Sequence, residues 1–446
     1  MNPILPVFIL ILPIIIILTL FLKEQKFRQA FVMISRRQYR QAIDILEKFN
    51  SDNGRAVSTC WGLAKANFGL GRYDRALSLL RRIPLSRTDG SQFFTTYEYY
   101  SFLSDTLLSL DKYQESIKYL MYLKEKFGDT AKVNHKIGES FYRMEETRKA
   151  FHYLNIALGK GAGPETLFLL GIIYYKLGNY SESMVAMKKV MKADPGNQTA
   201  RVYLGFSFYK LKRYSQALSF LKQSSPPPEI EEMYFSILGF AAFNARDYAS
   251  CYIYLTKYLT FISMKAPEYR ESLYMLGHSA EQIGKFEEAA GFWEQLALTD
   301  PAYPGAVLRY QLSRVYLKSR MFKNFLFSPK ETFRDLVQGL LEKMHYTLLT
   351  VFETTESEVV CLASEDDVNP QFGKRVIIFN SSARPEDAMG NHALESTLKL
   401  CKEEDCNGAV IMTVGIVEKD FQSAAGTHKI VIHGMEELSR LLMIGD

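Results

Sequence analysis

The sequence predicts a mostly α-helical protein with three parts: a single N-terminal transmembrane helix, an α-solenoid of helix hairpins, and a small C-terminal α/β domain. Three observations predict this class. An uncharged apolar run opens the chain, a motif recurs about every 34 residues through its middle, and strand-like segments appear only in its last quarter. At 446 residues the chain is too long for one hydrophobic core, so several structural units are expected.

The first element is the apolar run from Pro3 to Leu22, which contains no charged residue. About 20 apolar residues cross a hydrocarbon core of ~30 Å as a helix. A cleaved signal peptide is the alternative, but no basic residue precedes the run and no A-x-A-like cleavage site follows it. We therefore expect residues 1–24 to form an uncleaved transmembrane anchor.

The charges beside this run predict its orientation. Several basic residues follow it and none precedes it: Lys23, Lys26, Arg28, Arg36, Arg37 and Arg40. By the positive-inside rule, the C-terminus is expected in the cytoplasm of a single-pass protein of the cell membrane, typical of a bacterial inner membrane. The five scattered cysteines agree with a reducing compartment, and their spacing predicts no metal site.

The middle of the chain, residues 25–325, repeats one helical pattern. Each copy has an apolar helix, a short turn, and then an aromatic residue with a small residue three positions later. The small residues are Ala42, Ala76, Ser116, Ala150, Ser183, Ala217, Cys251 and Ala289. Their spacings are 34, 40, 34, 33, 34, 34 and 38 residues. Such a period indicates helix hairpins that bury their apolar faces by stacking on one another.

This pattern resembles the tetratricopeptide repeat (TPR) family. The small eighth position of that repeat is occupied by Ala64, Gly138, Gly171, Gly205, Gly239 and Gly277. The aromatic residue that opens its second helix is Tyr39, Tyr73, Tyr113, Tyr180, Tyr214, Tyr248 or Phe286. Two copies depart from the pattern, with Thr147 in the place of the aromatic residue and Ser104 at the small position. The resemblance implies about eight to nine repeats and a concave face that binds protein partners.

Polar residues on the first helices of the repeats are candidates for partner binding. Asn134, Gln198 and Arg201 are such residues, and their side chains are suited to a partner's carboxylate. The alternative is that these positions are simply solvated. The seven histidines form no H-x-x-x-H motif or triad-like arrangement. We therefore expect no cofactor, no small-molecule substrate and no enzymatic activity.

The last part, residues 326–446, changes to an α/β pattern. An amphipathic helix, ETFRDLVQGLLEKMHY, precedes the strand-like segments TLLTVFE, SEVVCLA and KRVIIFN. A helix, a buried strand GAVIMTVG, a strand HKIVIHG and a final helix follow. This order predicts a small α/β domain.

The order resembles the restriction-endonuclease-like fold, in particular its Mrr-type branch, most clearly in NGAVIMTVGIVEKDFQSAAGTHKIVIHGMEELSRLL. The resemblance implies a metal-binding acid on the second strand and a Q/E-x-K motif on the third. The corresponding places here hold Val360, Ile378 and Asn380, which cannot perform that chemistry. Glu358, two residues from the acid's place, is the alternative metal ligand. We expect the domain to be catalytically inactive.

Charge distribution favours the same conclusion. Residues 326–446 contain 11 Lys+Arg and 20 Asp+Glu, a net charge of −9, whereas the rest contains 43 and 29, a net charge of +14. Because an acidic domain repels nucleic acid, no nucleic-acid partner is expected. The basic part favours an acidic protein partner or anionic lipid headgroups.

Together these features predict a membrane-anchored scaffold or adaptor that mediates protein–protein interactions at the cytoplasmic membrane face. Two alternatives remain open. One is a membrane-tethered nuclease-like protein that processes DNA. The other is an envelope-biogenesis adaptor similar in layout to lipopolysaccharide assembly protein B, although this chain lacks the paired CxxC metal domain that ends that family.

Overall fold

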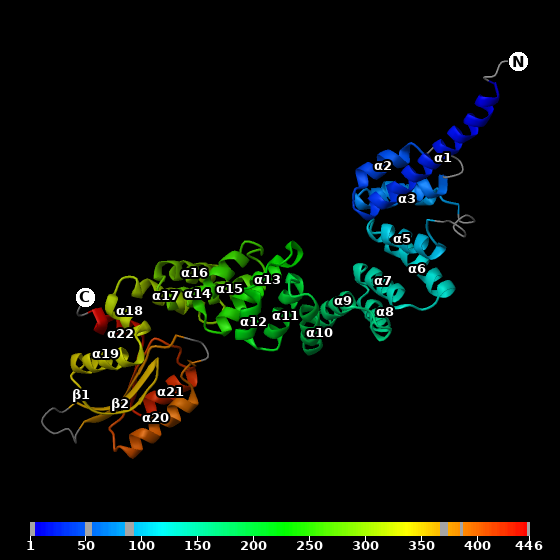
Figure 1. Ribbon diagram of the computed structural model, residues 1–446. Helices are drawn as coiled ribbons and strands as arrows, with labels where there is room; N and C mark the ends of the chain where they lie inside the picture. The colour runs from blue at the N-terminus through cyan, green and yellow to red at the C-terminus, as the bar shows by residue number, and fades with distance from the viewer. Residues whose placement is uncertain (1–4, 50–55, 85–92, 366–372, 384–386, 444–446) are drawn as a thin grey trace. The chain divides into compact units, whose positions relative to one another are not determined.

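The computed structural model describes residues 5–49, 56–84, 93–365, 373–383 and 387–443, with side chains from residue 17 onward (Figure 1). The chain divides into two compact units, Met1–Ser207 and Phe208–Asp446. The expectation of a mostly helical chain with a small strand-containing region at the C-terminal end is confirmed.

Unit 1 is a series of helices in which consecutive members pack against each other in pairs (Figure 1). The helices are α1 (Leu5–Ser35), α2 (Tyr39–Glu47), α3 (Ala56–Gly69), α4 (Tyr73–Arg81), α5 (Thr96–Leu108), α6 (Tyr113–Phe127), α7 (Ala131–Arg143), α8 (Thr147–Gly159), α9 (Pro164–Lys176), α10 (Tyr180–Ala193) and α11 (Gln198–Lys210), which continues into unit 2.

In unit 1, the turn inside each hairpin has one recurring backbone geometry. The residue two positions before the second helix has a positive φ, as in Gly71 (74°), Asp111 (57°) and Gly178 (80°). The next amide then donates to a carbonyl five residues earlier, for example Arg72 N to Asn67 O at 2.9 Å. This is the Schellman arrangement, which satisfies the last carbonyls of the first helix and reverses the chain. It explains why the second helix begins at the aromatic residue.

Small residues set the separation of the paired helices. The small residue three positions after the start of each second helix is fully buried, from Ala42 to Ala289. At the eighth position, a Cβ built on Gly138 would lie 2.6 Å from Leu154 Cγ, and one on Gly239 would lie 2.2 Å from Leu255 Cδ2. At these two positions glycine lets the paired helices approach more closely than a residue with a Cβ would allow.

Helix α1 continues without a break from the N-terminal segment into the first hairpin. Its Phe27 and Ala30 are buried against the core, whereas Ile17, Leu18 and Phe21 are more than half exposed. Among the residues open to description, no helix is both long and apolar enough to cross a membrane. The expected anchor from Pro3 to Leu22 lies largely outside the residues whose side chains are described.

Unit 2 continues the hairpins and ends in a sheet. Its helices are α12 (Tyr214–Leu221), a short 3-10 turn η2 (Pro228–Ile230), α13 (Glu231–Asn244), α14 (Tyr248–Tyr258), α15 (Pro267–Gln282), α16 (Phe286–Thr299), α17 (Ala306–Tyr316), α18 (Arg320–Phe327), α19 (Lys330–Lys343), α20 (Asn391–Glu403), α21 (Lys419–Thr427) and α22 (Met435–Met443). Its strands are β1 (Thr347–Thr354), β2 (Glu358–Ser364), β3 (Lys374–Asn380), β4 (Ala409–Thr413) and β5 (Ile430–His433).

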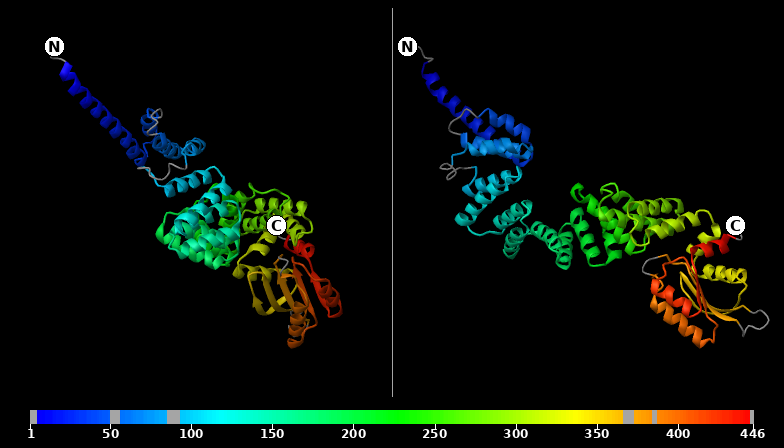
Figure 2. Two further views of the ribbon diagram at one scale, coloured as in Figure 1. Left: turned by 90° about the vertical axis from the view of Figure 1, so that its right-hand side faces the viewer. Right: turned by 180° about the vertical axis from the view of Figure 1, so that it is seen from behind.

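The five strands form one sheet in the order β1-β2-β3-β4-β5. β2 is antiparallel to β1 and β3, whereas β3, β4 and β5 are parallel. Figures 1 and 2 show α20 and α21 on one face and α19 with α22 on the other. Parallel neighbours need helical crossovers, and α20 and α21 supply them.

The last hairpin and the sheet share a hydrophobic core. Leu312 and Tyr316 of α17 and Phe322 and Phe325 of α18 belong to the same buried cluster as Phe379 of β3. The sheet is therefore packed directly onto the end of the helical array within unit 2. A fragment that begins at residue 326 would leave part of this core behind.

Candidate protein-binding face

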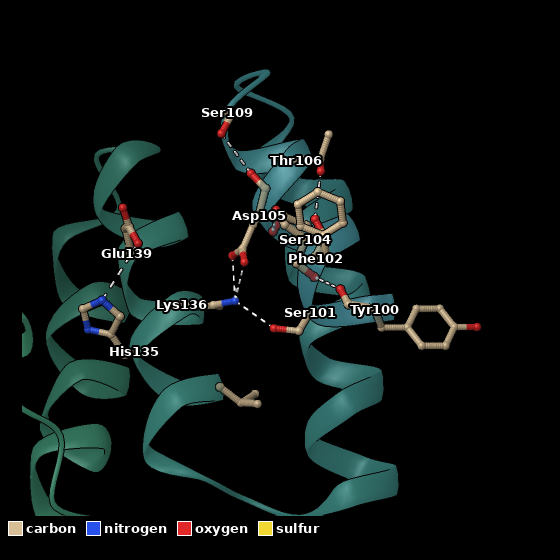
Figure 3. Close-up of polar contacts among 12 residues, drawn as sticks. Tyr100, Ser101, Phe102, Ser104, Asp105, Thr106, Ser109, His135, Lys136 and Glu139 are labelled. Atoms are coloured by element: carbon tan, nitrogen blue, oxygen red, sulfur yellow. Dashed lines mark hydrogen bonds and ion pairs between the residues drawn. The ribbon is translucent and has the colours of Figure 1, made fainter. Parts of the chain in front are cut away.

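One partly exposed polar group of unit 1 lies between the first helices of two consecutive hairpins, α5 and α7. Lys136 of α7 donates from Nζ to Ser101 Oγ at 2.9 Å and to Asp105 Oδ2 at 2.8 Å, and Asp105 Oδ1 lies 2.6 Å away (Figure 3). The two partners are one helical turn apart on α5, so both point toward the same ammonium.

Burial gives this contact its electrostatic character. The Lys136 side chain is only 11% exposed, whereas that of Asp105 is 37% exposed. Burial lowers the pKa of the Lys136 ammonium, and the Asp105 carboxylate opposes that change by favouring the charged form. The lysine is therefore a fixed internal cation that orients a carboxylate at the surface.

A second contact extends the polar group to α9, the first helix of the following hairpin. His135 Nδ1 and Thr166 Oγ1 are hydrogen-bonded at 2.9 Å, and His135 Nε2 lies 3.9 Å from Glu139 Oε2. Figure 3 shows His135 directed toward Glu139, whose side chain is 31% exposed. We call the six residues Ser101, Asp105, His135, Lys136, Glu139 and Thr166 the polar ladder.

Tyrosine and basic residues flank the ladder at the ends of the same helices. Tyr142 and Arg143 end α7, and Tyr175 and Lys176 end α9. A tyrosine followed by a basic residue therefore recurs 33 residues apart. Both tyrosines are half-buried, and Lys176 Nζ lies 4.9 Å from the Tyr142 ring centre. Such a surface offers carboxylates, cations and aromatic faces to an extended peptide.

The three candidate residues named from the sequence occupy other places. Asn134 is fully buried, and its Nδ2 donates to Asp129 Oδ1 and to Thr130 O at 2.8 Å, which fixes the loop between α6 and α7. Gln198 and Arg201 both lie at the start of α11, where they donate to the carbonyls of Gly196 and Pro195 at 3.4 and 3.0 Å. Asn134 and this pair therefore stand at two separate inter-repeat loops.

A different polar network lies in unit 2, fully enclosed between α15, α16 and α17. Glu281 accepts hydrogen bonds from Trp293 Nε1 at 2.8 Å and Tyr316 OH at 3.3 Å, and pairs with Arg309 Nη1 at 3.2 Å. Its side chain is 2% exposed. Burial raises the pKa of the Glu281 carboxyl, whereas Arg309 and the two hydrogen bonds lower it.

The nuclease-like positions of the sheet are apolar or internally bonded. Val360 and Ile378 are buried and paired opposite each other on β2 and β3. Asn380 donates from Nδ2 to Glu358 Oε2 at 3.1 Å. Burial raises the pKa of the Glu358 carboxyl, the bond from Asn380 lowers it, and Glu353 and Asp387 raise it further. Within the described ranges, no three His, Cys, Asp or Glu residues are grouped to hold a metal ion.

Comparisons with known proteins identify one repeat by sequence. The tetratricopeptide repeat family profile matches residues 164–197, which span α9 and α10. A comparison with curated protein sequences finds no match.

Several solved structures are similar to parts of the chain. The C-terminal part of a TPR repeat-containing protein from Cytophaga hutchinsonii is 14% identical, with a TM-score of 0.36, over 64% of this chain and 98% of that one. A thermophilic TPR protein from Thermus thermophilus is 18% identical, with a TM-score of 0.33, over 42% and 98%. MamA from Desulfovibrio magneticus RS-1 is 22% identical, with a TM-score of 0.32, over 40% and 98%. The profile match supports a tetratricopeptide repeat at residues 164–197.

Proposed function

We propose that this chain is a membrane-attached, non-enzymatic scaffold that binds a protein partner along the first helices of its unit 1 hairpins. The polar ladder carries this proposal. Lys136 is largely buried and fixed, whereas the side chains of Asp105 and Glu139 are about one-third exposed. Repeat arrays of this kind present their first helices on a concave surface, which suits an extended peptide.

The chemistry of the surface indicates what a partner segment needs. Asp105 and Glu139 accept hydrogen bonds, and Arg143 and Lys176 beside them are exposed cations. Tyr142 and Tyr175 add half-buried aromatic faces. A peptide with backbone amides, a carboxylate and an apolar side chain would satisfy each of these groups, whereas a purely apolar helix would leave the ladder unsatisfied.

Membrane attachment is the second part of the proposal. The uncharged run from Pro3 to Leu22 and the basic residues after it support a single anchor with a cytoplasmic C-terminus. The continuous α1 joins that run to the first hairpin. Confinement at the membrane raises the effective concentration of the scaffold for membrane-bound partners without any new contact.

For the sheet of unit 2 we propose a restriction-endonuclease-like fold without nuclease activity. The strand order and the helical crossovers support the fold. The burial of Val360 and Ile378, and the engagement of Asn380 with Glu358, support the loss of metal chemistry. The sheet would then serve as a second docking surface of the scaffold.

Site-specific photocrosslinking tests the binding face. A photoreactive amino acid at Glu139 or Tyr142 is expected to give a discrete protein adduct in intact membranes. The same probe at Lys189 is the matched control and is expected to give no adduct. Lys189 is an exposed residue on α10, which is the second helix of its hairpin. Lys136→Met should abolish the adducts because Asp105 loses its orienting cation. Adducts that are equal at Lys189, or that persist in Lys136→Met, would exclude the ladder as the binding face.

A further inference from the structure

The edge strand β5 of the unit 2 sheet is only partly covered on the face that carries α19 and α22. In parallel register, Ile377, Val410 and Val431 are neighbours across β3, β4 and β5, and Phe379, Met412 and His433 form the next row. These rows share one face because strand side chains alternate. The core with α19 and α22 covers Ile377 and Phe379, whereas Val431 on the edge strand is 43% exposed.

A pocket of about 490 Å³ lies over this edge. Its apolar floor is made by Val410, Met412 and Val431, and its polar lining includes Arg375, His433 and Arg440. Val410 and Met412 are almost completely buried, so the floor is set deep between the strands and α22. Pockets that hold small organic molecules typically measure about 300–1,000 Å³ and have this apolar composition.

The arginine on β3 is held in place from outside the pocket. Arg375 Nε donates to Glu365 Oε1 at 2.6 Å, and Tyr346 OH donates to the same oxygen at 2.7 Å. Its other N–H groups have no partner among the described residues. Because a guanidinium carries five donors in a rigid fork, one tethered edge leaves the other edge preorganised for an anion.

The arginine on α22 has an exposed side chain. Arg440 has no hydrogen bond or ion pair with any described residue, and neither has Glu437 one turn before it on the same helix. The surrounding residues 326–446 have a net charge of −9. Among the charged residues that line the pocket, Arg375 and Arg440 are basic and Glu437 is acidic, so the pocket lining is slightly basic within an acidic region.

We propose that this pocket binds a small amphipathic carboxylic acid, with its aliphatic or aromatic body on Val410, Met412 and Val431 and its carboxylate between Arg375 and Arg440. The apolar body gains from burial, and the carboxylate gains charge-assisted hydrogen bonds. Glu437 at the rim disfavours ligands with a second acidic group close to the first. This site is independent of the peptide-binding face of unit 1.

Methionine methyl signals provide a direct test in the full-length chain. The protein is labelled at methionine methyl groups and placed in detergent-free lipid nanodiscs, since detergents are themselves amphipathic. Met344 and Met412 line the pocket, and their signals are assigned by Met→Leu substitution. Met187, buried in unit 1, is the internal reference. Octanoate, octanol and acetate are titrated, and empty nanodiscs measure partitioning into lipid.

Octanoate is expected to shift the Met344 and Met412 signals saturably and to leave Met187 unchanged. Octanol, which lacks the charge, and acetate, which lacks the chain, should bind at least about tenfold more weakly. Arg440→Gln should weaken octanoate binding about five- to tenfold. Arg334→Gln, which removes an exposed arginine from α19, is the matched control and should leave binding unchanged.

Three results would overturn the proposal. Equal binding of octanol and octanoate would show that the pocket binds the apolar chain and does not recognise the carboxylate. Octanoate binding that is unchanged in Arg440→Gln would show that the carboxylate does not bind between Arg375 and Arg440. The absence of any saturable shift at Met344 and Met412 in the wild-type chain would show that the pocket takes no such ligand.

Discussion

Two polar networks described above, the ladder and the Glu281 network, join consecutive hairpins in the same way but differ in their access to water. The ladder of unit 1 links α5, α7 and α9 and keeps Asp105 and Glu139 about one-third exposed. The Glu281 network of unit 2 links α15, α16 and α17 and is sealed, with the glutamate side chain 2% exposed. The charged residues of both networks come from first helices of hairpins, which are the helices that line the inner face of a repeat array.

The difference shows how one scaffold can use similar residues for two purposes. In the sealed network every charge must find its partner inside the protein, so loss of one partner leaves an uncompensated buried charge. In the ladder, loss of Lys136 leaves only the partly exposed Asp105 carboxylate, which water can hydrate, so that loss costs little stability. The sealed network fixes how the hairpins stack, whereas the carboxylates of the ladder remain in contact with water.

The largest effect is expected for Glu281→Ala. This change leaves the Arg309 guanidinium, whose side chain is 11% exposed, without its counter-charge and should cost about 3–5 kcal/mol of unfolding free energy. Chemical denaturation followed by circular dichroism measures it. The double variant Glu281→Ala/Arg309→Met should recover most of the loss. A single-variant cost below about 1 kcal/mol would show that the network is not sealed in solution.

A smaller effect is expected from glycine substitutions at equivalent positions of the two units. A Cβ on Gly277 would lie 2.6 Å from the rigid Trp293 ring, so Gly277→Ala should cost about 1–3 kcal/mol. A Cβ on Gly171 would meet the flexible end of Met187 at 2.7 Å, so Gly171→Ala should be nearly neutral. Melting temperatures measure both. The reverse order of the two variants would contradict the stated packing.

Lys136→Met should change stability by less than about 1 kcal/mol, because the exposed Asp105 becomes hydrated. Methionine replaces the methylene stem of Lys136 with an apolar side chain of similar length. The same denaturation measurement as for Glu281→Ala provides the comparison. A loss as large as that of Glu281→Ala would erase the distinction between the two networks.

The smallest effect is a pH dependence at Glu358. Burial raises the pKa of this carboxyl, so the folded state keeps its proton to a higher pH than the unfolded chain, in which a glutamate titrates near pKa ~4.3. Its contribution to stability is present below that value and is lost as pH rises through the folded pKa. The melting temperature of Glu358→Gln relative to wild type should therefore rise as pH increases above ~4.3, by a few °C at most.

Glu356→Gln, an exposed neighbour on the same hairpin, is the matched control and should show no such trend. A relative melting temperature of Glu358→Gln that falls with pH would mean that the wild-type carboxylate is stabilised in its ionised form. That result would favour a cation beside Glu358 and would reopen the nuclease interpretation.

Much of the fold was accessible from the sequence because local chemistry determines it. Second helices begin at Tyr73, Tyr113, Tyr180, Tyr214 and Tyr248, since the turn before each of them is set by a left-handed residue two positions earlier. The strand-like segments likewise coincide closely with β1, β2 and β3. These elements depend on residues near one another in the chain.

The ladder was not accessible in this way. Lys136 and Asp105 are 31 residues apart and lie on different hairpins, so no short motif joins them. In the sequence, the signal for this contact is a pair of opposite charges at facing positions of consecutive repeats. Asn134 is a candidate from the sequence because it is polar and lies on a first helix, and in the structure its bonds to Asp129 and Thr130 anchor the loop before that helix. The pocket over β5 depends on sheet register and helix placement, which composition does not reveal.

The unbroken helix α1 has a mechanical consequence. Eight residues separate Leu22 from Ala30, which corresponds to an axial rise of about 12 Å. On the proposed membrane attachment, the first hairpin would therefore sit at a set height within the headgroup region, without a flexible tether. A change in the tilt of the anchor would then rotate that hairpin as a rigid lever, so the orientation of the first repeats would follow the thickness of the bilayer around them.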